Sequence, residues 1–192
     1  MAHAVDTTLT LSGQIMPTAC TLTMANGGSF DYGEFILPAS GKTVMPAQDS
    51  SLDVACAGPT LFAYTMTDNR AGTTPAGASS QALGLGLDQD QNPIGIYTFT
   101  MPPDSVVDGT GGRIGWSSNN GNSWANSGGT ETGRGLGFWY TLSRSGLSGT
   151  PVPVTTGRFN MTLTSTIEPK ANLDQTREIR IDGSSTFTLI YL

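Results

Sequence analysis

The sequence predicts an all-β fold, and three observations support this class. Gly and Pro supply 36 of the 192 residues, and Thr and Ser supply 45 more. Charged residues make up only 12%, about half of the usual ~25%, which argues against long solvated helices. No segment keeps a 3.6-residue period over three turns, whereas period-2 segments recur with turn signals between them, as in a β-sandwich or barrel.

The first alternating segment covers residues 5–15. Polar residues occupy its even positions, so the segment reads as a strand with one polar and one apolar face. The apolar face consists of Val5, Thr7, Leu9, Leu11, Gly13 and Ile15.

Further strands are predicted wherever the alternation returns. Residues 69–92 are expected to be loop-like, apart from a short strand near 83–87, and the Gly/Ser/Asn-rich residues 104–134 are expected to form one exposed excursion. The remaining predicted strands cover residues 18–24, 51–56, 61–67, 94–101, 136–143, 157–167 and 179–191.

Both termini are amphipathic β segments, which is unusual because the ends of most domains fray. The last segment runs to Tyr191 and Leu192 and alternates in the same way as residues 5–15. An unpaired strand of this kind exposes backbone donors and an apolar row, so both segments are expected to need partners.

The charge pattern excludes several classes of partner. The net charge is −6, and the nine Lys and Arg residues are scattered singly. No basic cluster could track phosphates, so we expect neither nucleic acid nor an anionic membrane surface as a partner. No apolar run reaches the ~18 residues of a transmembrane helix.

The two cysteines, Cys20 and Cys56, are interpreted as one disulfide, with two buried free thiols as the alternative. Zinc would need two further ligands, and the only histidine is His3. A disulfide requires an oxidising compartment. Ala2-His3-Ala4 has the small-x-small form of a signal-peptidase site, or is a chance match; we expect an exported protein whose mature chain begins near Val5.

Several of these segments together resemble the chaperone–usher pilins, which are fimbrial subunits. Residues 8–15 (TLTLSGQI), followed by Cys20, resemble the N-terminal extension and first cysteine of that family. Residues 51–56 (SLDVAC) stand where the family has its second cysteine, and residues 30–33 (FDYG) resemble its aromatic/acidic-Gly turn. Residues 185–192 (STFTLIYL) resemble its final strand with the penultimate tyrosine. Ile179 stands where the family often has a glycine, and Gly183 is the nearest inward glycine.

The resemblance implies an immunoglobulin-like sandwich that lacks its last strand and is completed by donor-strand exchange. Residues 1–16 would be the N-terminal extension and 17–192 the pilin domain. The donor face would be Val5, Thr7, Leu9, Leu11, Gly13 and Ile15, filling pockets in a neighbour. The acceptor groove and chaperone-binding strand would present Ile181, Gly183, Phe187, Leu189 and Tyr191.

This reading implies a structural subunit of a cell-surface fimbrium in a Gram-negative bacterium, exported through the periplasm and supporting adhesion or biofilm formation. Its partners would be other copies or related pilins in a head-to-tail filament, a periplasmic chaperone and an outer-membrane usher. Neither enzymatic activity nor a cofactor is expected. The residues alone also permit 5–15 to be the first strand of a closed sandwich.

Two alternatives come from other classes. Trp116 and Trp124 lie in the Gly/Ser/Asn-rich stretch and are candidates for stacking on a sugar, as in a monomeric secreted carbohydrate-binding β-sandwich. A small secreted hydrolase on a jelly roll is the other, although no histidine-based triad is available. The sequence from Asp88 copies half of a calcium loop, but Pro93 replaces the required glycine, so an acidic turn is predicted.

Overall fold

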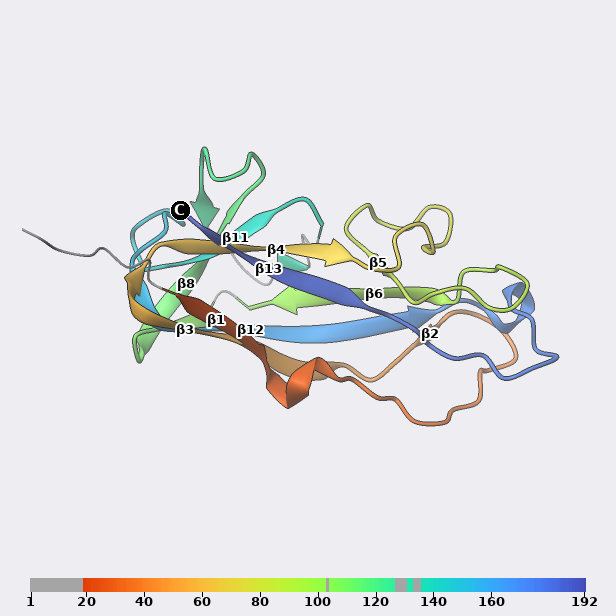
Figure 1. Ribbon diagram of the computed structural model, residues 1–192. Coiled ribbons are helices and arrows are strands. Elements are labelled where there is room, and N and C mark those ends of the chain that lie inside the picture. Colours follow the sequence, from red (N-terminus) through yellow and green to blue (C-terminus); the bar gives the residue numbers. More distant parts are fainter. Residues whose placement is uncertain (1–18, 103, 127–130, 133–135) are drawn as a thin grey trace, which may run out of the picture.

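The computed structural model describes residues 19–102, 104–126, 131–132 and 136–192, and this part of the chain is all-β. Two short 3-10 segments, η1 (Ala25–Gly28) and η2 (Lys170–Asn172), are the helical elements within it. The molecule is elongated, and β13 ends at one end of its long axis (Figure 1). The strands are β1 (Cys20–Met24), β2 (Thr43–Val44), β3 (Gln48–Thr60), β4 (Phe62–Asp68), β5 (Leu83–Gly84), β6 (Gly95–Met101), β7 (Asp104–Val107), β8 (Thr110–Ser117), β9 (Ala125–Asn126), β10 (Glu131–Thr132), β11 (Trp139–Ser143), β12 (Val154–Ile167) and β13 (Ser185–Tyr191).

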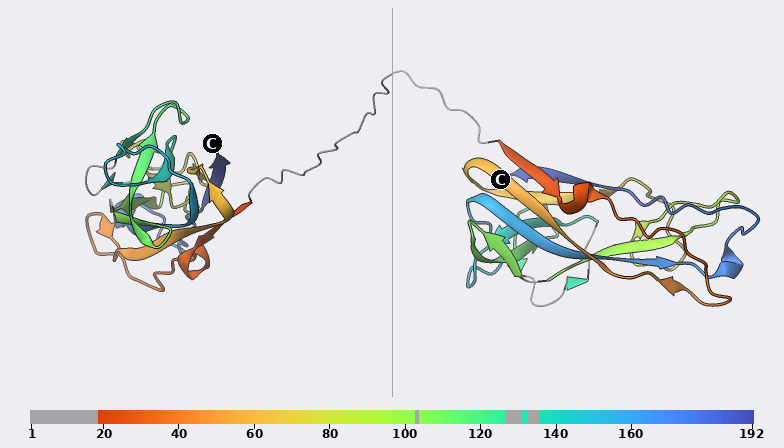
Figure 2. Two further views of the ribbon diagram at one scale, coloured as in Figure 1. Left: turned by 90° about the vertical axis from the view of Figure 1, so that its left-hand side faces the viewer. Right: turned by 90° about the horizontal axis from the view of Figure 1, so that it is seen from below.

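The strands form one sheet that curls into a nearly closed, barrel-like sandwich (Figure 2). Its main path runs β1-β3-β12-β7-β8-β11-β4-β13. The long β12 holds the sheet together, because it pairs with β3 on one side and with both β6 and β7 on the other. All of these pairings are antiparallel, so alternate side chains along each strand point into one shared interior.

The core follows from the period-2 pattern of the strands. In β12, Phe159, Met161 and Leu163 are buried, while the residues between them are only half-buried. The ring of Tyr64 lies at its centre, stacked on Tyr140 with centroids 5.2 Å apart and edge-on to Phe159 at 4.9 Å. Buried aromatic pairs of this kind contribute about 0.5–1.5 kcal/mol each beyond the area they bury.

The expected exposed excursion over residues 104–134 is wrong for its first half. Residues 104–107 and 110–117 form β7 and β8, which pair as a hairpin inside the sheet. Two of the three glycines of β8, Gly112 and Gly115, serve close packing rather than loop flexibility. A Cβ on the buried Gly115 would lie 1.9 Å from the carbonyl oxygen of Gly149, so only glycine fits between these backbones.

The predicted disulfide is confirmed, and the free-thiol alternative is wrong. Cys20 and Cys56 are bonded to each other and face each other across the β1–β3 pair, with their Cα atoms 3.9 Å apart. The bond ties the outermost strand of the sheet to its only strand partner among the described residues. In the described part of the chain, no helix has the length and apolar character needed to cross a membrane.

Candidate functional site

The sheet path ends at two open edges, β1 and β13, which lie on either side of a groove. Among the described residues, β1 pairs only with β3 and β13 only with β4. The two edges meet at one end, where the backbone N–H of Cys20 donates a hydrogen bond of 2.9 Å to the hydroxyl of Tyr191. No strand pairing joins β1 to β13 among the described residues, and the red β1 and blue β13 are drawn as neighbouring ribbons in Figures 1 and 2.

The opening between these edges holds a cavity of about 370 Å³, which we call the seam groove. Its lining comes from four parts of the chain: β1 with the residues after it, the loop before β6, strands β6 and β12, and the segment that leads into β13. The lining residues are Met24, Gly27, Gly28, Phe30, Tyr32, Leu85, Tyr97, Phe99, Leu163, Ser165, Ile181, Gly183, Ser184, Ser185 and Phe187.

One wall of the seam groove is the C-terminal segment, where the acceptor residues were predicted. Ile181, Gly183 and Phe187 line the groove, and Phe187 contacts the buried rings of Tyr64 and Phe99, each at 5.7 Å between centroids. A Cβ on Gly183 would lie 3.0 Å from Leu85 and 3.1 Å from Tyr97. A side chain at position 183 would therefore press against the groove floor.

The other two predicted acceptor residues lie further along β13. Leu189 is half-buried and packs against the core. Tyr191 is 54% exposed and lies at the end of the groove, where its hydroxyl accepts the bond from Cys20. The five predicted acceptor residues thus follow one edge of the sheet, from the groove to the contact with β1.

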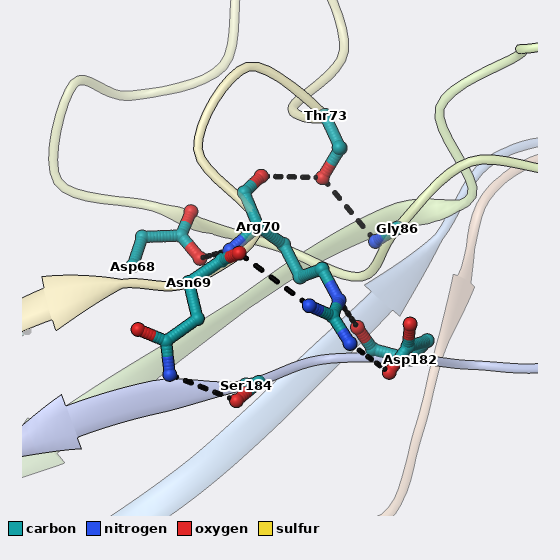
Figure 3. Close-up of polar contacts among 7 residues, drawn as sticks. All are labelled: Asp68, Asn69, Arg70, Thr73, Gly86, Asp182 and Ser184. Carbon is teal, nitrogen blue, oxygen red and sulfur yellow. Dashed lines mark hydrogen bonds and ion pairs between the residues drawn. The ribbon is translucent and has the colours of Figure 1, made fainter.

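A polar network fixes the start of this wall (Figure 3). The guanidinium of Arg70 donates to the Asp182 carbonyl oxygen at 3.0 Å and to the Asp182 carboxylate at 2.7 Å. Asn69 donates through its side chain to the Ser184 hydroxyl at 3.0 Å. Asp68 orients the turn that carries both residues, because its buried carboxylate accepts the N–H of Arg70 at 2.8 Å. The segment before β13 is therefore held beside β4 although it is not itself a strand.

The opposite wall is β1 and the residues that follow it. Leu22 and Met24 are half-buried and pack on the core, whereas the threonines between them are exposed. Beyond β1, the hydroxyl of Tyr32 donates to that of Ser165 in β12 at 3.2 Å. This wall thus presents apolar side chains that the domain covers only in part.

The floor is built by β6 and β12, and it is apolar. Phe99 and Leu163 are buried, and Tyr97 packs edge-on to Phe99 at 5.9 Å. Burial raises the pKa of Tyr97 to about 12, so the ring is neutral at any physiological pH. The seam groove thus offers an extended ligand two free strand edges and an uncharged floor.

Two further hollows continue this line toward the ends of the molecule. One is bordered by residues 30–37 and by the approach to β13, from Leu173 to Ile181. The other lies beside the end of β13 and is bordered by Ala19, Pro59, Thr60, Leu61, Pro153, Tyr191 and Leu192. The groove and its extensions follow the seam between the two open edges.

The six predicted donor residues, Val5, Thr7, Leu9, Leu11, Gly13 and Ile15, lie outside the described residues. The division into residues 1–16 and 17–192 also stays a prediction for this reason.

The two tryptophans predicted as glycan contacts pack against residues of neighbouring segments. Trp116 is in β8, donates its indole N–H to the Asn126 carbonyl oxygen at 3.3 Å and packs edge-on to Phe138 at 5.7 Å. Trp124 lies close to Gly121, on which the ring of Trp139 also rests. Both tryptophans are half-buried, and a sugar contact by either stays a prediction.

The acidic turn that copies half of a calcium loop is closed by its own backbone. The buried carboxylate of Asp88 accepts N–H bonds from Asp90 at 3.0 Å, Asn92 at 2.8 Å and Asp174 at 2.7 Å. Burial alone would raise the pKa of Asp88, but these hydrogen bonds outweigh it, and its pKa lies below the ordinary value. The described residues contain no group of three or more His, Cys, Asp or Glu placed to hold a metal ion.

The sequence interpretation missed the floor and the N-terminal wall of the groove. Met24, Tyr97, Phe99 and Leu163 belong to segments whose alternation was visible, whereas Phe30 belongs to a predicted turn. Alternation shows which side chains face inward, but it does not show which of them line a cavity. The Arg70–Asp182 pair joins positions 112 apart and had no local signal.

The chain is similar to known sequences whose descriptions name no activity. Residues 9–98 match a family model described as a protein of unknown function, DUF1120. The chain is 26% identical to the Escherichia coli (strain K12) protein named GltF, over 98% of this chain and 89% of that protein. No solved structure matches. Residues 9–98 include the predicted donor segment from Leu9 onward, the disulfide and strands β1 to β5 with part of β6. The similarity to the family model therefore includes the part of the chain that builds the N-terminal wall.

Proposed function

We propose that this protein is a structural subunit of a chaperone–usher fimbrium, and that it polymerises by placing residues 5–15 of one copy in the seam groove of the next. The observation that carries the proposal is that β1 and β13 each pair with a single strand among the described residues, with a groove beside them over the aromatic and aliphatic side chains of β6 and β12. In this reading the fold is an immunoglobulin-like sandwich that lacks its last strand, and the donated segment supplies it.

The dimensions of the two elements support the match. The donor segment 5–15 and the acceptor wall 181–191 are each eleven residues long. Eleven extended residues span about 36 Å at ~3.3 Å per residue. A strand in the groove would bond to the free backbone of β13 on one side and of β1 on the other, and its apolar face would cover the floor. Main-chain bonds would supply affinity and the alternating side chains would set the register.

The direction of donation follows from where the described chain begins. Cys20 lies beside Tyr191, so a donated segment would start from the end of the domain where β13 stops. Only four residues, 16–19, separate the donor segment from Cys20, and they span at most about 17 Å. A donor antiparallel to β13 puts Ile15 at the Ile181 end of the acceptor. The donor domain then stands beyond that end, and the contact repeats head to tail without closing, as a filament requires.

The same groove is the expected binding site for a periplasmic chaperone before assembly. An apolar floor between two open strand edges is an aggregation hazard, so the subunit needs a temporary strand until a neighbour replaces it. An outer-membrane usher would complete the pathway, with adhesion or biofilm formation as the role of the fibre. No enzymatic step is part of this proposal.

The test adds the donor strand as a peptide. A chain lacking residues 1–16 is purified, and its thermal unfolding is measured with and without a peptide of residues 5–15. At a peptide concentration 100 times its Kd, we expect stabilisation by about 2.7 kcal/mol. A peptide carrying Leu9→Asp is the matched control, because it buries a charge on the apolar floor and should give no shift.

A second measurement uses the complete chain. Electron microscopy should show filaments for the unaltered protein and single particles for Leu9→Asp. A shortened chain that is a stable monomer and is indifferent to both peptides would contradict the proposal. It would favour a self-contained sandwich that is complete without residues 5–15.

A further inference from the structure

The exposed apolar side chains gather at the two ends of the molecule. Nine large hydrophobic residues of the described chain are exposed, and six of them lie near the ends of the seam between β1 and β13. At the Ile181 end are Phe35, Ile36 and Val44, which are 39%, 93% and 67% exposed. At the Tyr191 end are Leu61, Tyr191 and Leu192, which are 38%, 54% and 46% exposed.

Both ends have a hollow, but Ile36 at the Ile181 end is far more exposed than the apolar side chains at the Tyr191 end. Ile36 is almost fully exposed, on the stretch that borders the hollow next to Ile181. The other end is concave, because Leu61, Tyr191 and Leu192 border a hollow of about 550 Å³ together with Pro59 and Pro153. None of the side chains bordering this hollow is charged. The backbone N–H of Leu192 bonds to the Leu61 carbonyl oxygen at 3.1 Å, which fixes the rim.

We propose that these ends bind each other between successive copies, with Ile36 of the acceptor copy in the Leu61–Leu192 hollow of the donor copy. The inference rests on the proposed function. With at most about 17 Å of chain between Ile15 and Cys20, an antiparallel donor brings the Tyr191 end of its own domain against the Ile181 end of the acceptor. The knob and the hollow then face each other at every joint of the filament.

This contact has a role that strand donation does not supply, because it sets the angle between neighbouring subunits of the filament. A four-residue connection alone would act as a hinge. An isoleucine seated in an apolar hollow would remove its exposed area from water at each joint and oppose bending. The surface is heterologous, so it adds one contact per joint without closing a ring.

Cysteine cross-linking across the joint tests the contact. A full-length double variant, Ile36→Cys with Leu192→Cys, is assembled and oxidised mildly, and the products are separated on a denaturing gel without reductant. We expect a ladder of disulfide-linked multimers and loss of the monomer band. The matched control pairs Leu192→Cys with Thr67→Cys, because Thr67 is exposed but lies on β4 opposite Thr186, between the two ends, and it should stay monomeric on the gel.

Electron microscopy of the same samples separates the two proposals. Filaments that give no ladder for the double variant Ile36→Cys with Leu192→Cys would overturn the end contact and leave strand donation standing. Absence of filaments in the unaltered protein would overturn both. A second variant, Ile36→Ser, should still form filaments by strand donation, but with a persistence length shorter than that of the unaltered protein; an unchanged persistence length would also overturn the end contact.

Discussion

Removing the Cys20–Cys56 bond should lower the stability of the domain by about 4 kcal/mol. The bond closes a loop with a sequence separation of 36 residues, and the chain-entropy model gives about 3.8 kcal/mol for a loop of that size. The suggested variant combines Cys20→Ser with Cys56→Ala. Cys20 is half-buried and tolerates a hydroxyl, whereas Cys56 is only 9% exposed, so a serine at position 56 would bury its hydroxyl. The substitutions leave the hydrogen bonds between β1 and β3 in place.

Urea unfolding followed by tryptophan fluorescence measures this loss. With a slope of about 2 kcal/mol per M, a loss of 4 kcal/mol moves the midpoint by about 2 M. In thermal unfolding the same loss lowers Tm by about 8–16 °C for a chain of this size. Unaltered protein treated with a reductant is the control and should behave like the variant. An unchanged midpoint with an unchanged slope would refute the reasoning, because the bond would then place no constraint on the unfolded chain.

Three further predictions concern close packing and pH. Gly115→Ala should lower the free energy of unfolding by at least about 1–3 kcal/mol in urea, because the added Cβ meets the Gly149 carbonyl oxygen. Gly111→Ala on the same strand places its Cβ in open space and should have little effect. Equal losses for the two variants would contradict this account. The pKa of Asp88 is lowered in the folded protein, so its contribution to stability is complete above about pH 4 and is lost as the pH falls through the folded pKa. Stability measured between pH 5 and 2 should therefore fall less steeply in Asp88→Asn, and parallel curves would count against this role. Burial raises the pKa of Tyr97 from 10.0 to about 12, so stability should decline as pH rises from 10 to 12, and Tyr97→Phe should lessen that decline in thermal melts.

The strands were predictable where their alternation was undisturbed. The predicted segments 51–56, 61–67, 94–101 and 157–167 all fall on strands, although β3 and β12 are longer than expected. The prediction failed at β8, where Gly111, Gly112 and Gly115 resemble a loop. Glycine in a strand marks either flexibility or a close approach of two backbones. For Gly115, the position of Gly149 decides between these two interpretations, and Gly149 belongs to a different part of the chain.

The candidate site was predictable on one side only. The alternation from Ile181 to Tyr191 identified the residues of the C-terminal wall, since an edge strand carries its own apolar row. The floor and the opposite wall, with Tyr97, Phe99 and Met24, had no comparable signal. Their inward direction was visible in the sequence, but their position around one cavity depends on contacts between distant segments of the chain.

The sequence by itself determined the fold class, the amphipathic ends and the pair of cysteines, because these properties depend on residue type and on the period of two. The tertiary structure decided which strands are neighbours. Strand order depends on contacts between distant residues, such as Cys20 with Cys56 and Arg70 with Asp182, and local periodicity carries no information about them. Among the described residues, that order places β1 and β13 at the two ends of the sheet path, and the groove lies between the segments next to them.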